Sequence, residues 1–92
     1  MWTILESDDV LKAARKLKPE ILRKYELWKA IVRVSGPTGL REIKGFHDEA
    51  LSGKWRGHRS SRLSKQFRVL YRAEDDEVAV YVIDVNAHDY RR

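Results

Sequence analysis

The chain has 92 residues, enough for one small domain with a single hydrophobic core. Its 19 Lys and Arg against 14 Asp and Glu give a net charge of +5, and the absence of cysteine excludes a disulfide scaffold and a thiolate metal site. No apolar run approaches the ~20 residues of a membrane span, and the N-terminal stretch lacks the features of a signal peptide. We expect one cytoplasmic domain over residues 1–92 with no membrane partner.

The first part of the sequence predicts one strand followed by two helices. A short apolar run at residues 2–5 favours the strand, and Ser7, followed by two aspartates, offers an N-cap and acidic first-turn residues for a helix. Pro19 can begin a second helix, because its missing N–H costs little at that position. The apolar stripe of this helix continues to about Val34, and the glycine and proline that follow end it.

Residues 38–53 contain three glycines and follow no single period. Their apolar side chains favour an irregular segment or a short helix anchored on the core. His47, Asp48 and Glu49 stand together here, and one histidine beside two carboxylates is a weak signal for a metal or an acid–base site. We expect these residues to lie in a solvated turn, with no metal.

The most informative stretch is 54–72, KWRGHRSSRLSKQFRVLYR, which contains no Asp or Glu. Three aromatic residues are interleaved with its basic ones, and such a surface suits a polyanion better than a small neutral substrate. The alternative is a solvated, positively charged face without a ligand, and composition does not choose between the two. The candidate nucleic-acid contacts in this stretch are Lys54, Arg56, His58, Arg59, Arg62, Lys65, Arg68 and Arg72.

The second half of this stretch predicts a β-hairpin whose phase shows which side chains share a face. Alternating apolar residues from Phe67 onward indicate a strand with one face on the core. A three-residue connection at 64–66 places Leu63 opposite Phe67 on that core. A two-residue connection would instead pair Arg62 with Phe67 and bury a charge, at a cost of several kcal/mol. Arg62 should therefore lie opposite Arg68 on an exposed outer face, where two guanidiniums repel unless an anion lies between them.

The last strand and the tail complete the expected fold. The nearly continuous apolar run 78–85 predicts a central strand buried on both faces. The order of elements predicts an α+β domain, with two N-terminal helices packed on one face of a four-stranded, mainly antiparallel sheet. The basic residues should occupy the opposite face. His88 and Tyr90 follow the last strand directly and should emerge at an edge of the sheet.

These residues fit cleavage of RNA by its own 2′-hydroxyl, a reaction for which no metal or cofactor is needed. The reaction requires a base for the hydroxyl proton, a cation for the crowded phosphate and an acid for the leaving oxygen. Arg62 and Arg68 suit the phosphate. His88 could be acid or base, and Tyr90 could stack on a base or donate a proton. His58 is a reserve candidate for proton transfer, and the alternative for His88 is a surface histidine in a frayed tail.

Several motifs resemble the RelE/ParE superfamily of bacterial toxins from type II toxin–antitoxin modules. The resemblance covers most of the chain and is best from Leu51 onward. Residues 51–55, LSGKW, resemble the Leu-Ser-Gly-x-Trp segment before the hairpin of YoeB-like members. The hairpin 61–72 is similar to that of RelE, YoeB and HigB types, with a basic strand, a polar turn and an aromatic-Arg-hydrophobic-hydrophobic-Tyr pattern. Residues 80–83 resemble the last strand, and 88–90, HDY, resemble the YoeB and HigB tails.

The resemblance implies a compact domain of two helices against an antiparallel sheet. It also implies ribosome-dependent cleavage of mRNA in the A site and inhibition by a cognate antitoxin, so the expected partners are an antitoxin, the ribosome and mRNA. The catalytic arginine of the family corresponds to Arg68. The histidine and tyrosine of the family's tail correspond to His88 and Tyr90.

Three departures from the family patterns leave the general base open. The RelE type has two lysines in the first hairpin strand, where this chain has Ser60 and Arg62, and arginine is a poor base. The YoeB type has a glutamate ahead of its Leu-Ser-Gly, and Glu49 lies nearby in this sequence. The HigB type often ends its tail with histidine, where this chain has Arg91, a further candidate RNA contact.

Two other functions compete with RNA cleavage. ParE-like members of the superfamily bind DNA gyrase and cleave nothing, although that branch generally lacks the His- and Tyr-bearing tail. A domain that only holds nucleic acid or an antitoxin, without activity, is the third interpretation.

Overall fold

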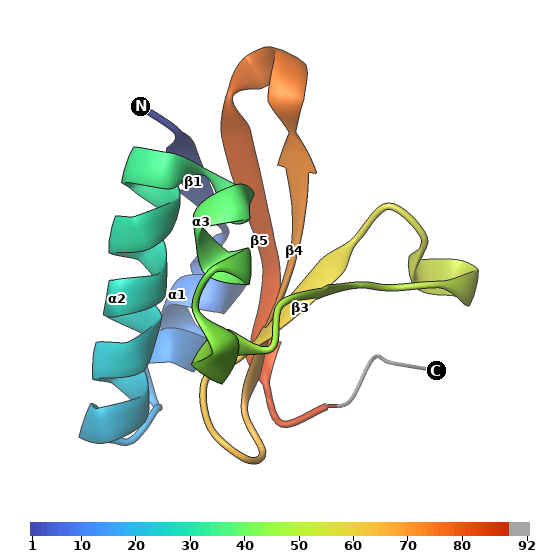
Figure 1. Ribbon diagram of the computed structural model, residues 1–92. Helices are drawn as coiled ribbons and strands as arrows, with labels where there is room; N and C mark the ends of the chain where they lie inside the picture. The colour runs from blue at the N-terminus through green and yellow to red at the C-terminus, as the bar shows by residue number, and fades with distance from the viewer. Residues whose placement is uncertain (89–92) are drawn as a thin grey trace.

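The computed structural model describes residues 1–88 and begins with the predicted strand and two helices. Strand β1 (Thr3–Glu6) leads into α1 (Asp8–Arg15), where the Ser7 hydroxyl accepts a hydrogen bond of 3.2 Å from the backbone N–H of Val10. Helix α2 (Pro19–Ser35) has its proline in the first turn. Both helices lie on one side of the sheet in Figure 1.

Gly36 makes the turn from α2 into the short helix α3 (Pro37–Arg41). Its φ of 69° and ψ of −174° form a combination that is essentially restricted to glycine. A side chain here would also place its Cβ 2.6 Å from the indole of Trp2. The turn and the close approach of Trp2 therefore both require glycine, and α3 provides the short helix that the sequence left as an alternative.

Within residues 1–88, the sheet contains five strands in the order β1-β5-β4-β3-β2. Strand β1 runs parallel to β5, and all other neighbours are antiparallel. The remaining strands are β2 (Glu49–Ala50), β3 (Arg59–Arg62), β4 (Arg68–Glu74) and β5 (Ala79–Asn86). The α+β prediction is confirmed, with five strands in place of four. The extra strand, β2, has only two residues, which is too short for alternation to reveal it.

The β3–β4 hairpin has the predicted register. Arg62 pairs with Arg68, and the backbone N–H of Leu63 donates a hydrogen bond of 2.8 Å to the carbonyl of Phe67, so the three-residue connection is confirmed. The inward-facing residues of the hairpin join those of the helices and β5 in one core. Its members include Trp28, Tyr25, Tyr71, Phe46, Leu40, Val69, Val80 and Leu63.

Strand β5 is not buried on both faces as predicted. Tyr71 pairs with Val82 and Leu70 pairs with Asp84, so the intervening Ile83 has no partner on β4 and is 40% exposed. A β-bulge of this kind reverses the alternation of faces along the strand. An apolar run read from sequence cannot show where that reversal occurs.

Asp48, which the sequence places in a solvated turn, has a buried side chain that is 0% exposed. Its Oδ2 accepts a hydrogen bond of 2.9 Å from Nε of Arg59 and lies 2.8 Å from Nη2 of the same guanidinium. Its Oδ1 accepts hydrogen bonds from the hydroxyls of Ser61 at 2.7 Å and Tyr71 at 2.5 Å. Ser61 in turn accepts a hydrogen bond of 2.9 Å from Nε1 of Trp28. The expectation was wrong because these partners come from β3, β4 and α2, far along the chain.

Two buried tyrosines hold their protons more tightly than usual. Burial raises the pKa of Tyr71 above its ordinary value of 10.0, and the charge of Asp48 raises it further. Burial and the hydrogen bond to Glu6, 2.8 Å long, raise the pKa of Tyr25 in the same direction.

Replacing Asp48 with alanine should lower the free energy of unfolding by about 3–5 kcal/mol. The Arg59 guanidinium would remain largely buried without its carboxylate, and two hydroxyls would lose their acceptor. Urea denaturation measures the loss. As a control, Asp76→Ala in an exposed turn should change the unfolding free energy by less than about 0.5 kcal/mol. Equal losses in the two variants would show that the Asp48 network does not hold the fold.

Stability should fall as the pH rises above about 10. The unfolded chain releases the protons of Tyr25 and Tyr71 near that pH, whereas the folded chain keeps them, so the unfolded state binds fewer protons. Each tyrosine should contribute a slope of about −1.4 kcal/mol per pH unit to the unfolding free energy. Urea denaturation at increasing alkaline pH should show a shallower slope in Tyr71→Phe and in Tyr25→Phe. Slopes that match wild type in both variants would contradict the assignment.

Candidate active site

Arg62 and Arg68 lie side by side on the sheet face that points away from the helices. Arg62 of β3 pairs with Arg68 of β4, and Arg68 pairs on its other side with Asn86 of β5. The predicted pairing of Arg62 with Arg68 across the hairpin is confirmed. Nε of Arg62 is buried and has no hydrogen-bond acceptor among residues 1–88. We call Arg62 and Arg68 the arginine row. A buried unsatisfied donor costs about 1–3 kcal/mol, so the arginine row favours an anion that can accept a hydrogen bond from Nε of Arg62.

Arg68 is far less accessible than predicted, with an exposed fraction of 4%. The hairpin phase predicted the correct face, but the expectation of an exposed side chain was wrong. Strand β4 has neighbours on both sides, and the same face carries an apolar cluster of Leu51, Leu70 and Trp55. The outer face is therefore partly covered, and a test of Arg68 needs a substitution that keeps most of its volume.

The outer face also carries two carboxylates, Glu49 and Asp84, which the sequence did not assign to it. Glu49 pairs with Ser60 across β2 and β3, and Asp84 pairs with Leu70 across β4 and β5. Because Ser60 and Leu70 also pair with each other, all four residues form one row beside the arginine row. Glu49 follows the inward-facing Asp48, so strand alternation turns it outward. The sequence signals for it were its position ahead of the Leu-Ser-Gly segment and its place beside His47 and Asp48.

Arg59 and Arg72, both candidate RNA contacts, already have partners within the chain. Arg59 faces the helix side of the sheet, where its guanidinium is paired with Asp48. Nη1 of Arg72 lies 2.6 Å from Oε1 of Glu74, and its guanidinium carbon lies 4.1 Å from the ring centroid of Tyr81. The two arginines therefore lie on opposite faces and do not form one binding surface.

The remaining candidates in the basic stretch are the exposed residues Lys54, Arg56 and Lys65 and the half-buried His58. The first two belong to the loop around a 3-10 turn, η2 (Gly53–Trp55), which projects away from the helices in Figure 1. Lys65 lies in the hairpin connection. The ring of His58 packs edge-on against Trp55 with 5.5 Å between centroids, and its Nδ1 is buried without a hydrogen-bond partner in the described chain.

His88 lies near the arginine row. It follows two residues after Asn86, the partner of Arg68, and its backbone N–H donates a hydrogen bond of 2.7 Å to the side-chain oxygen of Asn86. His88 is exposed. Tyr90 and Arg91 lie outside the described residues, and their roles stay predictions.

Within residues 1–88, no group of three His, Cys, Asp or Glu side chains is placed to hold a metal ion. No helix in that range is long and apolar enough to cross a membrane.

Comparison with solved structures shows a shared fold across nearly the whole chain. A RelE–RelB complex from the archaeon Pyrococcus horikoshii matches with a TM-score of 0.74 and 18% identity, covering 94% of this chain and 93% of that one. A YoeB/ParE toxin from Agrobacterium tumefaciens matches with a TM-score of 0.75 and 14% identity, covering 95% and 99%. YafQ from E. coli matches with a TM-score of 0.73 and 15% identity, covering 96% and 94%. No protein-family model and no curated protein matches the sequence. The chain therefore has the fold of the RelE and YoeB toxins.

Proposed function

We propose that this chain is the toxin of a type II toxin–antitoxin module and a metal-independent endoribonuclease that cleaves mRNA on the ribosome. The observation that carries the proposal is the adjacent pair Arg62 and Arg68 on the outer sheet face, where β3 ends and β4 begins. Nε of Arg62 is buried without an acceptor among residues 1–88, and a phosphate bound beside the two arginines could accept a hydrogen bond from it. The fold shared with RelE, YoeB and YafQ toxins supports the same function.

In this proposal the two arginines stabilise the reacting phosphate. The 2′-hydroxyl of the RNA attacks the adjacent phosphorus, and negative charge accumulates on the phosphate oxygens as the bond to the 5′-oxygen breaks. A guanidinium already held in a strand is preorganised for that charge, so it stabilises the transition state more than the ground state. Arg68 is the more firmly held of the two, because it is almost fully buried.

Proton transfer falls to groups around the arginine row. Glu49 is a candidate base that the strand pairing adds, since a carboxylate accepts a proton and arginine does not. It pairs with Ser60, two residues from Arg62 on the same face, and such diagonal neighbours lie about 7–8 Å apart, which leaves room for a nucleotide between them. His88 is then the candidate acid for the leaving oxygen, with Tyr90 as a stacking group or a second acid.

The wider RNA contacts come from the cations of the outer face and its loops. Lys54 and Arg56 on the η2 loop and Lys65 in the hairpin connection are exposed and can follow an RNA backbone. His58, Arg72 and Arg91 complete the proposed set. Arg59 is the least suited of the predicted contacts, because its guanidinium faces the helix side and is paired with Asp48.

A second candidate function is gyrase inhibition of the ParE type. One structure with this fold carries both names, YoeB and ParE, so the fold alone does not separate the two activities. The expected order of cellular effects does separate them.

Induced alone in bacteria, the chain should arrest growth by blocking translation. Pulse labelling should show protein synthesis falling before DNA synthesis, because cleavage of ribosome-bound mRNA acts directly on translation. The companion experiment is co-expression with the product of the neighbouring reading frame, which should co-purify with the chain and restore growth. An earlier fall in DNA synthesis with stalled gyrase would favour the ParE-like function instead.

Arg68→Gln should slow mRNA cleavage by roughly 100- to 1000-fold, because it removes one charged donor from the transition state. Glutamine keeps much of the side-chain volume at this buried position, and Arg62→Gln should act in the same direction. Replacing His88 with alanine or Tyr90 with phenylalanine should slow cleavage by about 100-fold if either residue moves a proton. The measurement is primer extension on ribosome-bound mRNA, beside a ribosome-binding assay in which these variants should change much less.

The matched control is Arg33→Gln, which removes an exposed guanidinium from the helix side and should cleave like wild type. Melting curves identify any variant that fails to fold. Tight ribosome binding by wild type without any cleavage would make this chain a binding domain. Cleavage that survives Arg68→Gln unchanged would move the active site away from the arginine row.

A further inference from the structure

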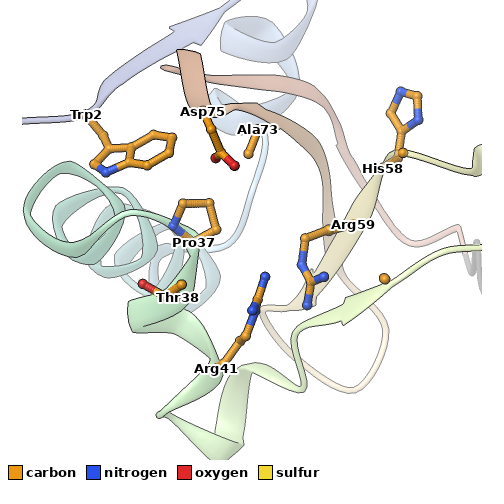
Figure 2. Close-up of a pocket in the computed structure, with 10 residues that line it drawn as sticks. Trp2, Pro37, Thr38, Arg41, His58, Arg59, Ala73 and Asp75 are labelled. Carbon is orange, nitrogen blue, oxygen red and sulfur yellow. The ribbon is translucent and has the colours of Figure 1, made fainter. Parts of the chain in front are cut away.

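A cleft of about 440 Å³ opens on the helix side of the sheet, away from the arginine row. Figure 2 shows that its walls come from segments far apart in the sequence, including the start of the chain, α3 and the strands. Its apolar walls are Trp2, Pro37, Ala50 and Ala73. A cleft of this volume is in the range that proteins use for specific ligands.

The charge in the cleft is concentrated in two arginines that point toward one another in Figure 2. Arg59 is already compensated by Asp48. Arg41, at the end of α3, is exposed and makes no ion pair or hydrogen bond to any residue of the described chain. The cleft therefore offers one uncompensated guanidinium between apolar walls, an arrangement that recognises a carboxylate next to an apolar group.

This composition favours a protein segment over a nucleic acid. A phosphate backbone carries closely spaced charges and is bound by arrays of cations, whereas only Arg41 is uncompensated here. Asp75 also lines the cleft and repels any anion near it, so a bound carboxylate must lie at the Arg41 end, and a run of closely spaced phosphates is disfavoured. An acidic side chain flanked by an apolar one could pair with Arg41 and cover Trp2 and Pro37.

We propose that this cleft anchors the antitoxin through an acidic side chain that pairs with Arg41. The inference rests on the proposed toxin function. The cleft and the arginine row occupy opposite faces of the sheet, so Arg41 is separate from the two arginines proposed to hold the reacting phosphate, while His58, a candidate RNA contact, lines the cleft as well. Loss of the anchor should therefore produce a toxin that still acts but escapes neutralisation.

The test is Arg41→Glu, compared with Arg23→Glu on the exposed surface of α2 as a matched charge reversal. The probe is the purified product of the reading frame that adjoins this chain's gene. Arg41→Glu should weaken its binding by about tenfold or more, because an attractive pair becomes repulsive. Growth arrest by Arg41→Glu alone should equal that of wild type, while rescue by the neighbour should fail. Arg23→Glu should be bound and rescued normally.

The outcomes separate this inference from the proposed function. Normal binding and rescue of a folded Arg41→Glu variant would overturn the anchor, as would a neighbour that does not bind wild type at all. Loss of growth arrest in Arg41→Glu would assign Arg41 to ribosome or RNA contacts and would also overturn it. If wild type cleaves no mRNA and yet Arg41→Glu specifically loses the neighbour, the anchor stands and the nuclease proposal fails.

Discussion

The hairpin side of this fold depends on the ion pair and hydrogen bonds made by the buried carboxylate of Asp48. An isolated charge in a core is strongly destabilising, but this one accepts hydrogen bonds from a guanidinium and two hydroxyls, one of which is held by Trp28. Its donors fasten the two-residue strand β2 to β3, β4 and helix α2. Since neighbouring strand residues face opposite ways, the inward turn of Asp48 also sends Glu49 outward toward the arginine row. Asp48 thus organises the core side of the sheet, and Glu49, the next residue, lies on the outer face.

The sequence predicted those parts of the structure in which inward-facing and outward-facing residues recur at a regular spacing along the chain. The hairpin register followed because only one connection length kept Leu63 on the core and Arg62 off it. The Asp48 network could not be found this way, because its hydrogen-bonding partners lie 11, 13 and 23 residues away and leave no local pattern. Strand β2 was missed for a related reason, since two residues cannot display alternation.

The sheet face on which a residue lies and the degree to which it is buried are separate properties, and Arg68 shows the difference. Alternation placed it on the correct face, but its depth depends on neighbours that a single strand does not reveal. Strand β4 lies between β3 and β5, and Leu51 and Trp55 return from an earlier loop to pack on Leu70 of the same face. The sequence alone suggests a solvated cationic sheet, whereas the structure shows a held guanidinium beside an apolar patch. A held guanidinium is better suited to transition-state stabilisation, because less reorganisation is needed when the charge develops.

The arginine row also lowers the stability of the protein when no anion is bound to it. Nε of Arg62 is buried and has no acceptor among residues 1–88, which adds a desolvation cost. An anion that accepts from this Nε, and that binds the folded state but not the unfolded chain, offsets this cost and raises stability by mass action. Under the proposed function, an RNA phosphate would be such an anion. Under the further proposal, the helix-side cleft would bind the antitoxin on the face of the sheet opposite the arginine row.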